Sequence, residues 1–151
     1  MQFMSRAKTI PNEEKFRSML KSRGFRITET RMAVHRAMMD LEHATAEQVA
    51  EWLKANNDAA ASVSSIYNVL QQMAVAGIYA YRLSADSKRY FDVCNFSHAH
   101  LYDRKNGVYK NLPDGAIREV INATLKKHRF RGYTVEDIDV QVVCHKRGES
   151  R

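Results

Sequence analysis

Residues 62–93 hold the feature that most restricts what this chain can fold into, an amphipathic helix followed at once by a basic hairpin. In the stretch SVSSIYNVLQQMAVAG, apolar residues recur at helical spacing and define a buried stripe, made of Val63, Ile66, Leu70 and Met73. The next runs, IYAYRL and KRYFDV, are aromatic and β-prone, and the turn-forming SADS joins them. This order is typical of a winged helix-turn-helix, in which the last helix enters the major groove and the hairpin contacts the sugar-phosphate backbone.

Three further helices are predicted before residue 62, each from a capping residue followed by an apolar face. Asn12 begins the first helix, Thr28 the second and Thr45 the third, where Gln48 completes a capping box three residues later. Their apolar faces are expected to be buried and consist of Phe16, Met19, Leu20, Met32, Val34, Met38, Val49, Trp52 and Leu53. The first half of the chain is therefore expected to be a helical domain that ends in a hairpin.

The second half has the pattern of a smaller lobe. HAHLYD and GVYKNL are strand-like and flank the turn signal RKNG, while GAIREVINATLKKH has the apolar spacing of a helix. The last run, YTVEDIDVQVVCHK, alternates from Ile138 to Cys144 and predicts one half-buried strand. Because so few elements bury little apolar surface, pairing with a second copy is expected. The predicted fold is α+β, with a winged helix-turn-helix domain over 1–93, a hinge at 94–97 and a small α/β dimerisation domain over 98–151.

The charge of the chain favours a polyanionic partner. The formal net charge is +7 and the pI is about 9.5, and clustered Lys and Arg gain binding free energy by displacing counterions from phosphates. Double-stranded DNA is the polyanion that the winged-helix pattern selects. No apolar run reaches the ~20 residues of a membrane-spanning helix, so we expect a cytoplasmic protein without a membrane partner. Cys94 and Cys144 belong to no Cys-x-x-Cys motif, which argues against a cysteine-only zinc site.

The polar face of the helix predicted in SVSSIYNVLQQMAVAG carries the predicted base contacts. Tyr67 is expected against a thymine methyl or sugar, and Asn68 can pair with adenine through N6 and N7. The other polar residues of this face would assist them: Ser64, Ser65 and Gln71. Contacts to the DNA backbone are predicted for basic residues elsewhere, namely Arg26, Arg31, Arg82, Lys88 and Arg89. A merely solvated helix is the alternative for this face taken alone.

The stretch RYFDVCNFSHAH places an acid and two histidines close together. In an extended strand, His98 and His100 project from the same face with Cα atoms about 6.5–7 Å apart, so both imidazoles can reach one ion. Asp92, at the end of the hairpin, offers an oxygen ligand, and His43 lies just before the third helix, where its side chain can turn toward the hairpin. This nitrogen and oxygen set suits iron(II), manganese(II) or zinc(II). Two solvated histidines on an edge strand are the alternative.

The order HATAEQV, SSIYNVLQQMAVAGI, RYFD and HAH resembles the ferric uptake regulator (Fur) family of metal-responsive repressors, from about the first helix to the last strand. The resemblance implies a homodimeric transcription regulator that binds an AT-rich inverted repeat when iron or manganese draws its two domains together. It assigns an interdomain metal site to His43, Asp92, His98 and His100. The fifth ligand of the family, an acid, falls at Asn111, whose amide oxygen carries no charge, so altered metal binding is expected.

The chain departs from the family pattern at the positions of a structural zinc site and at two residues that differ between branches of the family. Many members hold a structural zinc with two Cys-x-x-Cys pairs, and neither pair is complete here. The corresponding positions are Asp103, Asn106, Cys144 and Arg147. No structural zinc is therefore predicted. Asp92 and Asn68 look more like the peroxide-sensing and iron-response (Irr-like) branches, which leaves iron, peroxide and haem open as signals.

Two other functions fit parts of the pattern. Asp92, His98 and His100 would also serve a non-haem iron oxygenase, although the chain lacks the strands of the double-sheet barrel that usually holds such a triad. A winged-helix regulator with a degenerate site would bind DNA without metal, and Asn111 keeps this alternative open. The remaining histidines are expected at the surface or at helix ends: His35, His128 and His145.

Overall fold

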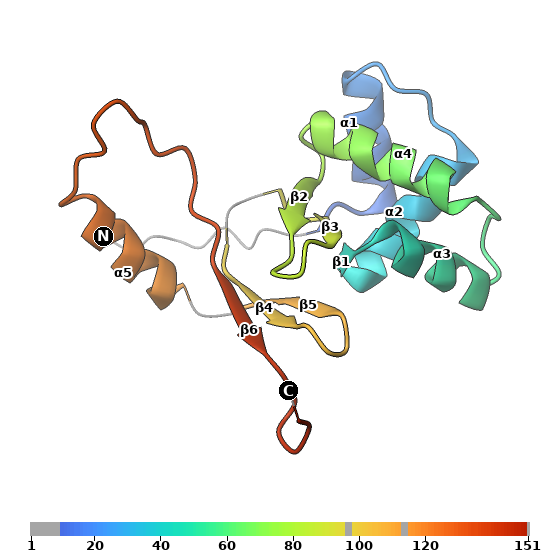
Figure 1. Cartoon of the computed structure of the whole chain (residues 1–151). Coiled ribbons are helices and arrows are strands. Elements are labelled where there is room, and N and C mark those ends of the chain that lie inside the picture. The colour runs from blue at the N-terminus through green and yellow to red at the C-terminus, as the bar shows by residue number, and fades with distance from the viewer. Residues whose placement is uncertain (1–9, 96–97, 113–114, 151) are drawn as a thin grey trace. The chain divides into compact units, whose positions relative to one another are not determined.

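The computed structural model describes residues 10–95, 98–112 and 115–150 (Figure 1). These residues form two compact units, and the chain passes from one to the other within the hairpin. The first unit contains the described residues up to Arg82, together with Arg89–Asn95. The second contains Leu83–Lys88 and the described residues after Asn95. Residues 96–97 of the predicted hinge lie outside the described part of the chain.

The first unit consists mainly of helices whose starts are fixed by side-chain caps. Helix α1 spans Glu13–Ser22, α2 spans Glu29–Leu41, α3 spans Ala46–Ala55 and α4 spans Val63–Val75 (Figure 1). Asn12 and Thr28 each accept a hydrogen bond from the backbone N–H three residues later, at 2.8 and 3.2 Å. Thr45 and Gln48 form a complete capping box. The predicted helix starts are therefore confirmed, because each cap satisfies N–H groups that the helix itself cannot.

A small sheet completes the first unit. Strand β1 is His43–Ala44, β2 is Ala80–Leu83 and β3 is Arg89–Asp92, in the order β1-β3-β2. The predicted hairpin is formed by β2 and β3. Strand β1 pairs antiparallel with β3, and the Glu42 carbonyl beside it accepts from the Val93 N–H at 3.0 Å. The sequence does not predict β1, because two residues are too few to show a period.

The core of the first unit includes most of the stripe predicted for α4. Ile66, Leu70 and Met73 are fully buried. Val63 is 41% exposed, contrary to the prediction, since it is the first residue of the helix; Val69 completes the buried face instead. Trp52 is only half-buried, and its Nε1 donates to Asp40 Oδ2 at 2.6 Å.

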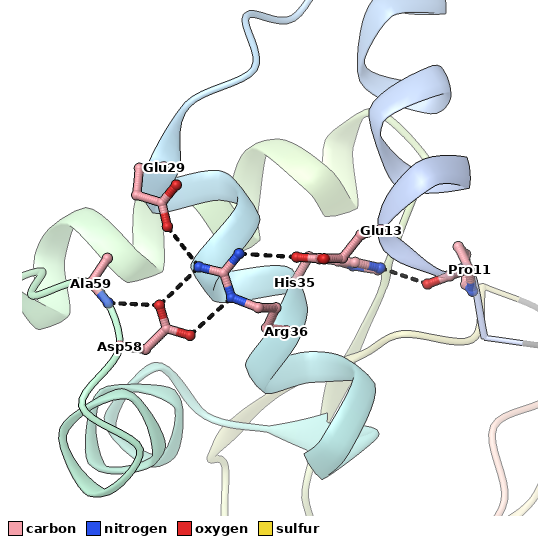
Figure 2. Close-up of polar contacts among 7 residues, drawn as sticks. All are labelled: Pro11, Glu13, Glu29, His35, Arg36, Asp58 and Ala59. Carbon is pink, nitrogen blue, oxygen red and sulfur yellow. Dashed lines mark hydrogen bonds and ion pairs between the residues drawn. The ribbon is translucent and has the colours of Figure 1, made fainter.

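His35 lies in the core, so the surface position predicted for it is wrong. Its ring is fully buried and stacks on Phe16, with ring centroids 3.9 Å apart. Nε2 donates to the Pro11 carbonyl at 2.6 Å (Figure 2), which leaves Nδ1 of the neutral ring to accept from the Tyr79 hydroxyl at 2.7 Å. Burial lowers the pKa of His35. Both hydrogen-bond partners are distant in sequence, so no local spacing points to them.

Arg36 joins separate segments of the first unit (Figure 2). Its Nε and Nη2 donate to the two carboxylate oxygens of Asp58 at 2.9 and 2.8 Å. The same guanidinium contacts Glu13 at 2.9 Å and Glu29 at 2.7 Å. Asp58 also accepts from the Ala59 N–H at 2.7 Å, and the Arg36 hydrogen bond lowers the pKa of Asp58. The network thereby fastens the turn before α4 to α1 and α2.

The second unit contains a mixed sheet. Strand β4 is His100–Asp103, β5 is Val108–Asn111 and β6 is Gln141–Cys144, in the order β5-β4-β6. Strand β4 is antiparallel to β5 and parallel to β6. The last strand is shorter than predicted: it begins at Gln141, and the residues from Ile138 to Val140 have no strand structure. His128 and His145 are exposed, as predicted.

Helix α5, Ala116–Leu125, leaves an apolar face open. None of its residues, all of which the structure describes, is buried. Val120 is 66% exposed, and Val142 and Val143 on β6 are 38% and 47% exposed. The second unit thus has apolar surface that it does not cover itself. Within the described residues, no helix is both long enough and apolar enough to cross a membrane.

Candidate metal ligands and nucleic-acid interface

His43 and Asp92 form one pair of candidate ligands, inside the first unit. They lie opposite each other on β1 and β3, and His43 Nε2 is 3.1 Å from Asp92 Oδ2. The other carboxylate oxygen, Oδ1, accepts from the Cys94 N–H at 2.8 Å. The two side chains are 1% and 0% exposed. The strand register therefore fixes an imidazole nitrogen beside a carboxylate whose orientation is set by a backbone hydrogen bond.

Arg82 is a further charged group beside this pair. Its side chain is 10% exposed, and its Nε lies 3.9 Å from Asp92 Oδ2. The sequence groups Arg82 with the surface cations of the hairpin tip, but the structure buries it. Residues alternate between the two faces of β2, so Arg82 points away from the side of its exposed neighbours Tyr81 and Leu83. That alternation is the signal in the sequence that predicts the buried position.

His98 and His100 form a second pair of candidate ligands, inside the second unit. Their ring centroids are 4.3 Å apart, and the His100 ring lies 4.6 Å from that of Tyr109. His100 is fully buried at the start of β4, whereas His98 precedes the strand and is half-buried. Asn111, the predicted fifth ligand, is exposed and faces His100 in the register of β4 and β5.

The chemistry of these two pairs fits a first-row divalent metal ion. The first pair offers one imidazole and one carboxylate, the second offers two imidazoles, and neither contains a thiolate. Nitrogen and oxygen donors of this kind coordinate iron(II), manganese(II) and zinc(II). The members of each pair are already close, so binding to either pair costs little local rearrangement.

The polar face of α4 is accessible for most of its length. Ser64, Ser65 and Asn68 are exposed, and Tyr67 and Gln71 are half-buried. Ser65 also takes part in the helix cap, because its N–H donates to Ser62 Oγ at 3.1 Å. A shallow depression beside this face is lined by Ala46, Glu47, Val63, Ser64, Tyr67 and Asn68. Exposed donors and acceptors at one helix face are what reading of base edges requires.

Arg89 connects the hairpin to this helix face. Its Nη1 donates a hydrogen bond to the Tyr67 hydroxyl, and its guanidinium lies 5.4 Å from the centroid of the Tyr81 ring. The Tyr67 ring meets Phe91 edge-on at 5.8 Å. The contact residues predicted from the sequence do not include Tyr81, which is 43% exposed. Its exposed position follows from the alternation of Tyr81 and Arg82 between the two faces of β2. One continuous surface therefore joins α4 and the hairpin strands.

The other basic side chains predicted to contact the DNA backbone differ in how many protein groups hold them. Arg31 Nη2 donates to Gln72 Oε1 at 3.1 Å, and its Nη1 donates to the Arg26 carbonyl at 2.6 Å. Arg26 is exposed. Lys88 Nζ is 3.8 Å from Asp86 Oδ2, and the Lys88 side chain is 54% exposed. Arg31 is thus oriented from two sides, while Lys88 remains accessible.

The helices, the hairpin and the polar face of α4 define a winged-helix protein with a second, small α/β unit. The model of the ferric uptake regulator family matches residues 22–143 of this 151-residue chain. The chain belongs to the ferric uptake regulator family. Its members are transcription regulators rather than enzymes, so the oxygenase alternative is excluded.

Solved structures of the family share this fold. The ferric uptake regulator of Vibrio cholerae superposes with a TM-score of 0.72 at 19% identity, over 87% of this chain and 99% of that chain. That of Helicobacter pylori gives 0.67 at 21% identity, over 97% and 99%. A zinc-bound manganese uptake regulator gives 0.64 at 25% identity, over 85% and 97%. Comparison of the sequence with curated proteins gave no match. The predicted α+β fold, with a winged helix followed by a small α/β domain, is confirmed.

Proposed function

We propose that this protein is a homodimeric transcription regulator whose metal site combines His43 and Asp92 with His98 and His100. The observation that carries the proposal is the presence of a preformed ligand pair in each of the two units. An ion held by both pairs binds only those conformations in which the pairs meet. Metal binding therefore shifts the population toward such conformations and can change DNA affinity.

Iron(II) or manganese(II) is the proposed physiological ion, with zinc(II) able to substitute in vitro. The donor set supports this choice. Asn111 would add a neutral oxygen where the family pattern has an acid, which weakens the attraction for a cation. The solved relatives include a ferric uptake regulator from Pseudomonas aeruginosa with manganese and a zinc-bound manganese uptake regulator.

We propose that α4 reads DNA and that the hairpin contacts its backbone. Tyr67 and Asn68 lie on the accessible face of α4, and the depression beside Val63 and Tyr67 suits a thymine methyl. The proposed binding site is an AT-rich inverted repeat. Its two half-sites would each bind one copy of α4 of the homodimer. Arg89, beside Tyr67, would contact the backbone. Chromosomal DNA lies in the cytoplasm, where we place the protein.

Dimerisation is assigned to the second unit, which we propose holds no structural zinc. The exposed apolar face of α5 and the exposed valines of β6 would be covered by a second copy. At the positions of the first cysteine pair, Asp103 accepts hydrogen bonds from the Asn106 backbone and side chain at 3.1 and 2.8 Å. Asn106 Nδ2 also donates to Glu149 at 3.1 Å. Asp103 and Asn106 are thus engaged with each other and with Glu149.

The metal site is tested by anaerobic titration of the full-length protein with manganese(II), a stand-in for iron(II). Two single variants each replace one proposed ligand, Asp92→Asn in the first unit and His98→Ala in the second. Each should weaken manganese(II) binding at least tenfold. His128→Ala, an exposed histidine of the same chain, is the matched control and should bind as the wild type does. Unchanged affinity in both ligand variants would place the ion elsewhere.

The link to DNA is tested by fluorescence anisotropy on an AT-rich inverted repeat. We expect manganese(II) to change the affinity and Arg89→Met to lower the slope of affinity against salt concentration without changing the ranking of sequences. Equal affinity with and without metal would favour the metal-independent regulator. Peroxide is then added to the iron(II) protein, and haem to the metal-free protein. The compound that releases the protein from DNA is identified as the signal.

A further inference from the structure

Asp92 has a permanent positive partner within its own unit. A fully buried carboxylate is unstable without a compensating charge. Arg82 supplies one, because its guanidinium is always protonated and its Nε lies 3.9 Å from Asp92 Oδ2. With the two side chains only 10% and 0% exposed, water screens this attraction weakly. The carboxylate therefore has a compensating positive charge beside it before any metal ion arrives.

The oxygen that faces Arg82 is also the one that faces His43. His43 Nε2 lies 3.1 Å from the same Asp92 Oδ2, while Oδ1 is turned toward the Cys94 N–H. A metal ion held by His43 and Asp92 would use Oδ2, which places a divalent cation next to the guanidinium. Two positive charges at such a separation repel each other strongly where the dielectric constant is low.

We propose that Arg82 competes with the metal ion for Asp92 and so lowers the metal affinity of the site. This inference rests on the proposed function, because it assumes that Asp92 is a ligand. In the metal-free protein the Arg82 guanidinium on β2 lies beside the Asp92 carboxylate on β3. When metal binds, the guanidinium loses this ion pair and withdraws. The competition raises the metal concentration at which the site fills.

The position of Arg82 also gives its withdrawal a direct effect on the hairpin. Its neighbour Tyr81 lies on the other face of β2, under the Arg89 guanidinium. A change in the backbone of β2 at Arg82 therefore reaches the surface that carries Arg89 and Tyr67. The ion pair and the proposed DNA surface occupy opposite faces of the same strand.

The test is manganese(II) titration of full-length wild type and Arg82→Gln by isothermal calorimetry, at one pH and salt concentration. Removal of the competing charge should lower Kd at least tenfold, equivalent to about 1.4 kcal/mol. Arg82→Lys keeps the charge and should stay within about threefold of wild type. Lys88→Gln is the matched control, since it removes another cation of the hairpin that pairs with Asp86 instead of a ligand. It should leave Kd unchanged.

Unchanged or weaker binding by Arg82→Gln would overturn the competition. Asp92→Asn separates this result from failure of the site itself. If Asp92→Asn loses binding while Arg82→Gln gains none, only the role of Arg82 is wrong; if Asp92→Asn binds normally, the proposed site is wrong. Circular dichroism without metal checks that Arg82→Gln is folded before it is titrated. If it is unfolded, Arg82→Met is titrated against the same thresholds.

Discussion

Replacement of Arg36 by methionine should destabilise the first unit mainly through the loss of one partner, Asp58. The Arg36–Asp58 contact is bidentate, at 2.9 and 2.8 Å, and the two side chains are 28% and 17% exposed. Charge-assisted hydrogen bonds of this kind contribute about 1.5–3 kcal/mol. Glu29, whose side chain is 71% exposed, should contribute about 0.5 kcal/mol or less. Arg36→Met should therefore lower the unfolding free energy by about 2–3 kcal/mol.

A pair of double-mutant cycles separates the two contributions. The coupling energy of Arg36→Met with Asp58→Asn should be about 1.5 kcal/mol or more, and that with Glu29→Gln about 0.5 kcal/mol or less. Trp52 is the only tryptophan of the chain and lies in α3, so its fluorescence during urea unfolding reports on this unit. A coupling to Glu29 as large as that to Asp58 would refute the assignment of stability to the bidentate pair.

The same pair predicts a dependence on pH. Because Arg36 lowers the pKa of Asp58 in the folded protein, folding favours the ionised carboxylate. The coupling should be fully present above the unfolded aspartate pKa, about 3.9, and should be lost as the pH falls through the lower folded value. A coupling that persists unchanged at strongly acidic pH would contradict this reasoning.

Two further predictions concern the core and the second unit. Burial lowers the pKa of His35, so the unfolded chain binds a proton more readily, and the unfolding free energy should fall as the pH drops below about 6.5. Urea unfolding at pH 7.5 and pH 5 should show a smaller decrease for His35→Gln than for wild type, whereas His128→Gln should retain the wild-type decrease. Val120→Asp, on the exposed apolar face of α5, should shift sedimentation equilibrium from dimer to monomer. Asn122→Asp adds the same charge at an exposed position about 160° around the helix from Val120, and it should leave the proposed dimer intact. Equal behaviour of the two variants would exclude this face from the interface.

The parts of the fold that depend on local chemistry could be predicted from the sequence. Asn12, Thr28 and Thr45 each satisfy N–H groups within their own first turn, so a few residues contain all the information needed. The hairpin was likewise visible, because its turn and strands are contiguous. The apolar period of α4 predicted its buried face, apart from Val63 at the end of the helix.

The differences at His35 and at strand β1 involve contacts between distant segments. The residues next to His35 in sequence do not indicate its burial, because its partners Pro11 and Tyr79 lie 24 and 44 residues away. Arg82 differs from these, because its charge favours the surface while the alternation of β2 places it on the buried face. Strand β1 exists only because β3 pairs with it. Amino-acid composition and the spacing of apolar residues describe single segments. Neither specifies which segments contact each other in the fold.

The two-residue strand β1 makes the proposed metal site sensitive to chain length. His43 reaches Asp92 only in the observed register, and a shift by one residue would turn its imidazole to the other face of the sheet. Insertion or deletion of a single residue between α2 and α3 could therefore delete a ligand while both helices and their caps persist. If the proposed site controls DNA binding, a single change of this kind would remove metal control and leave the surface of α4 intact.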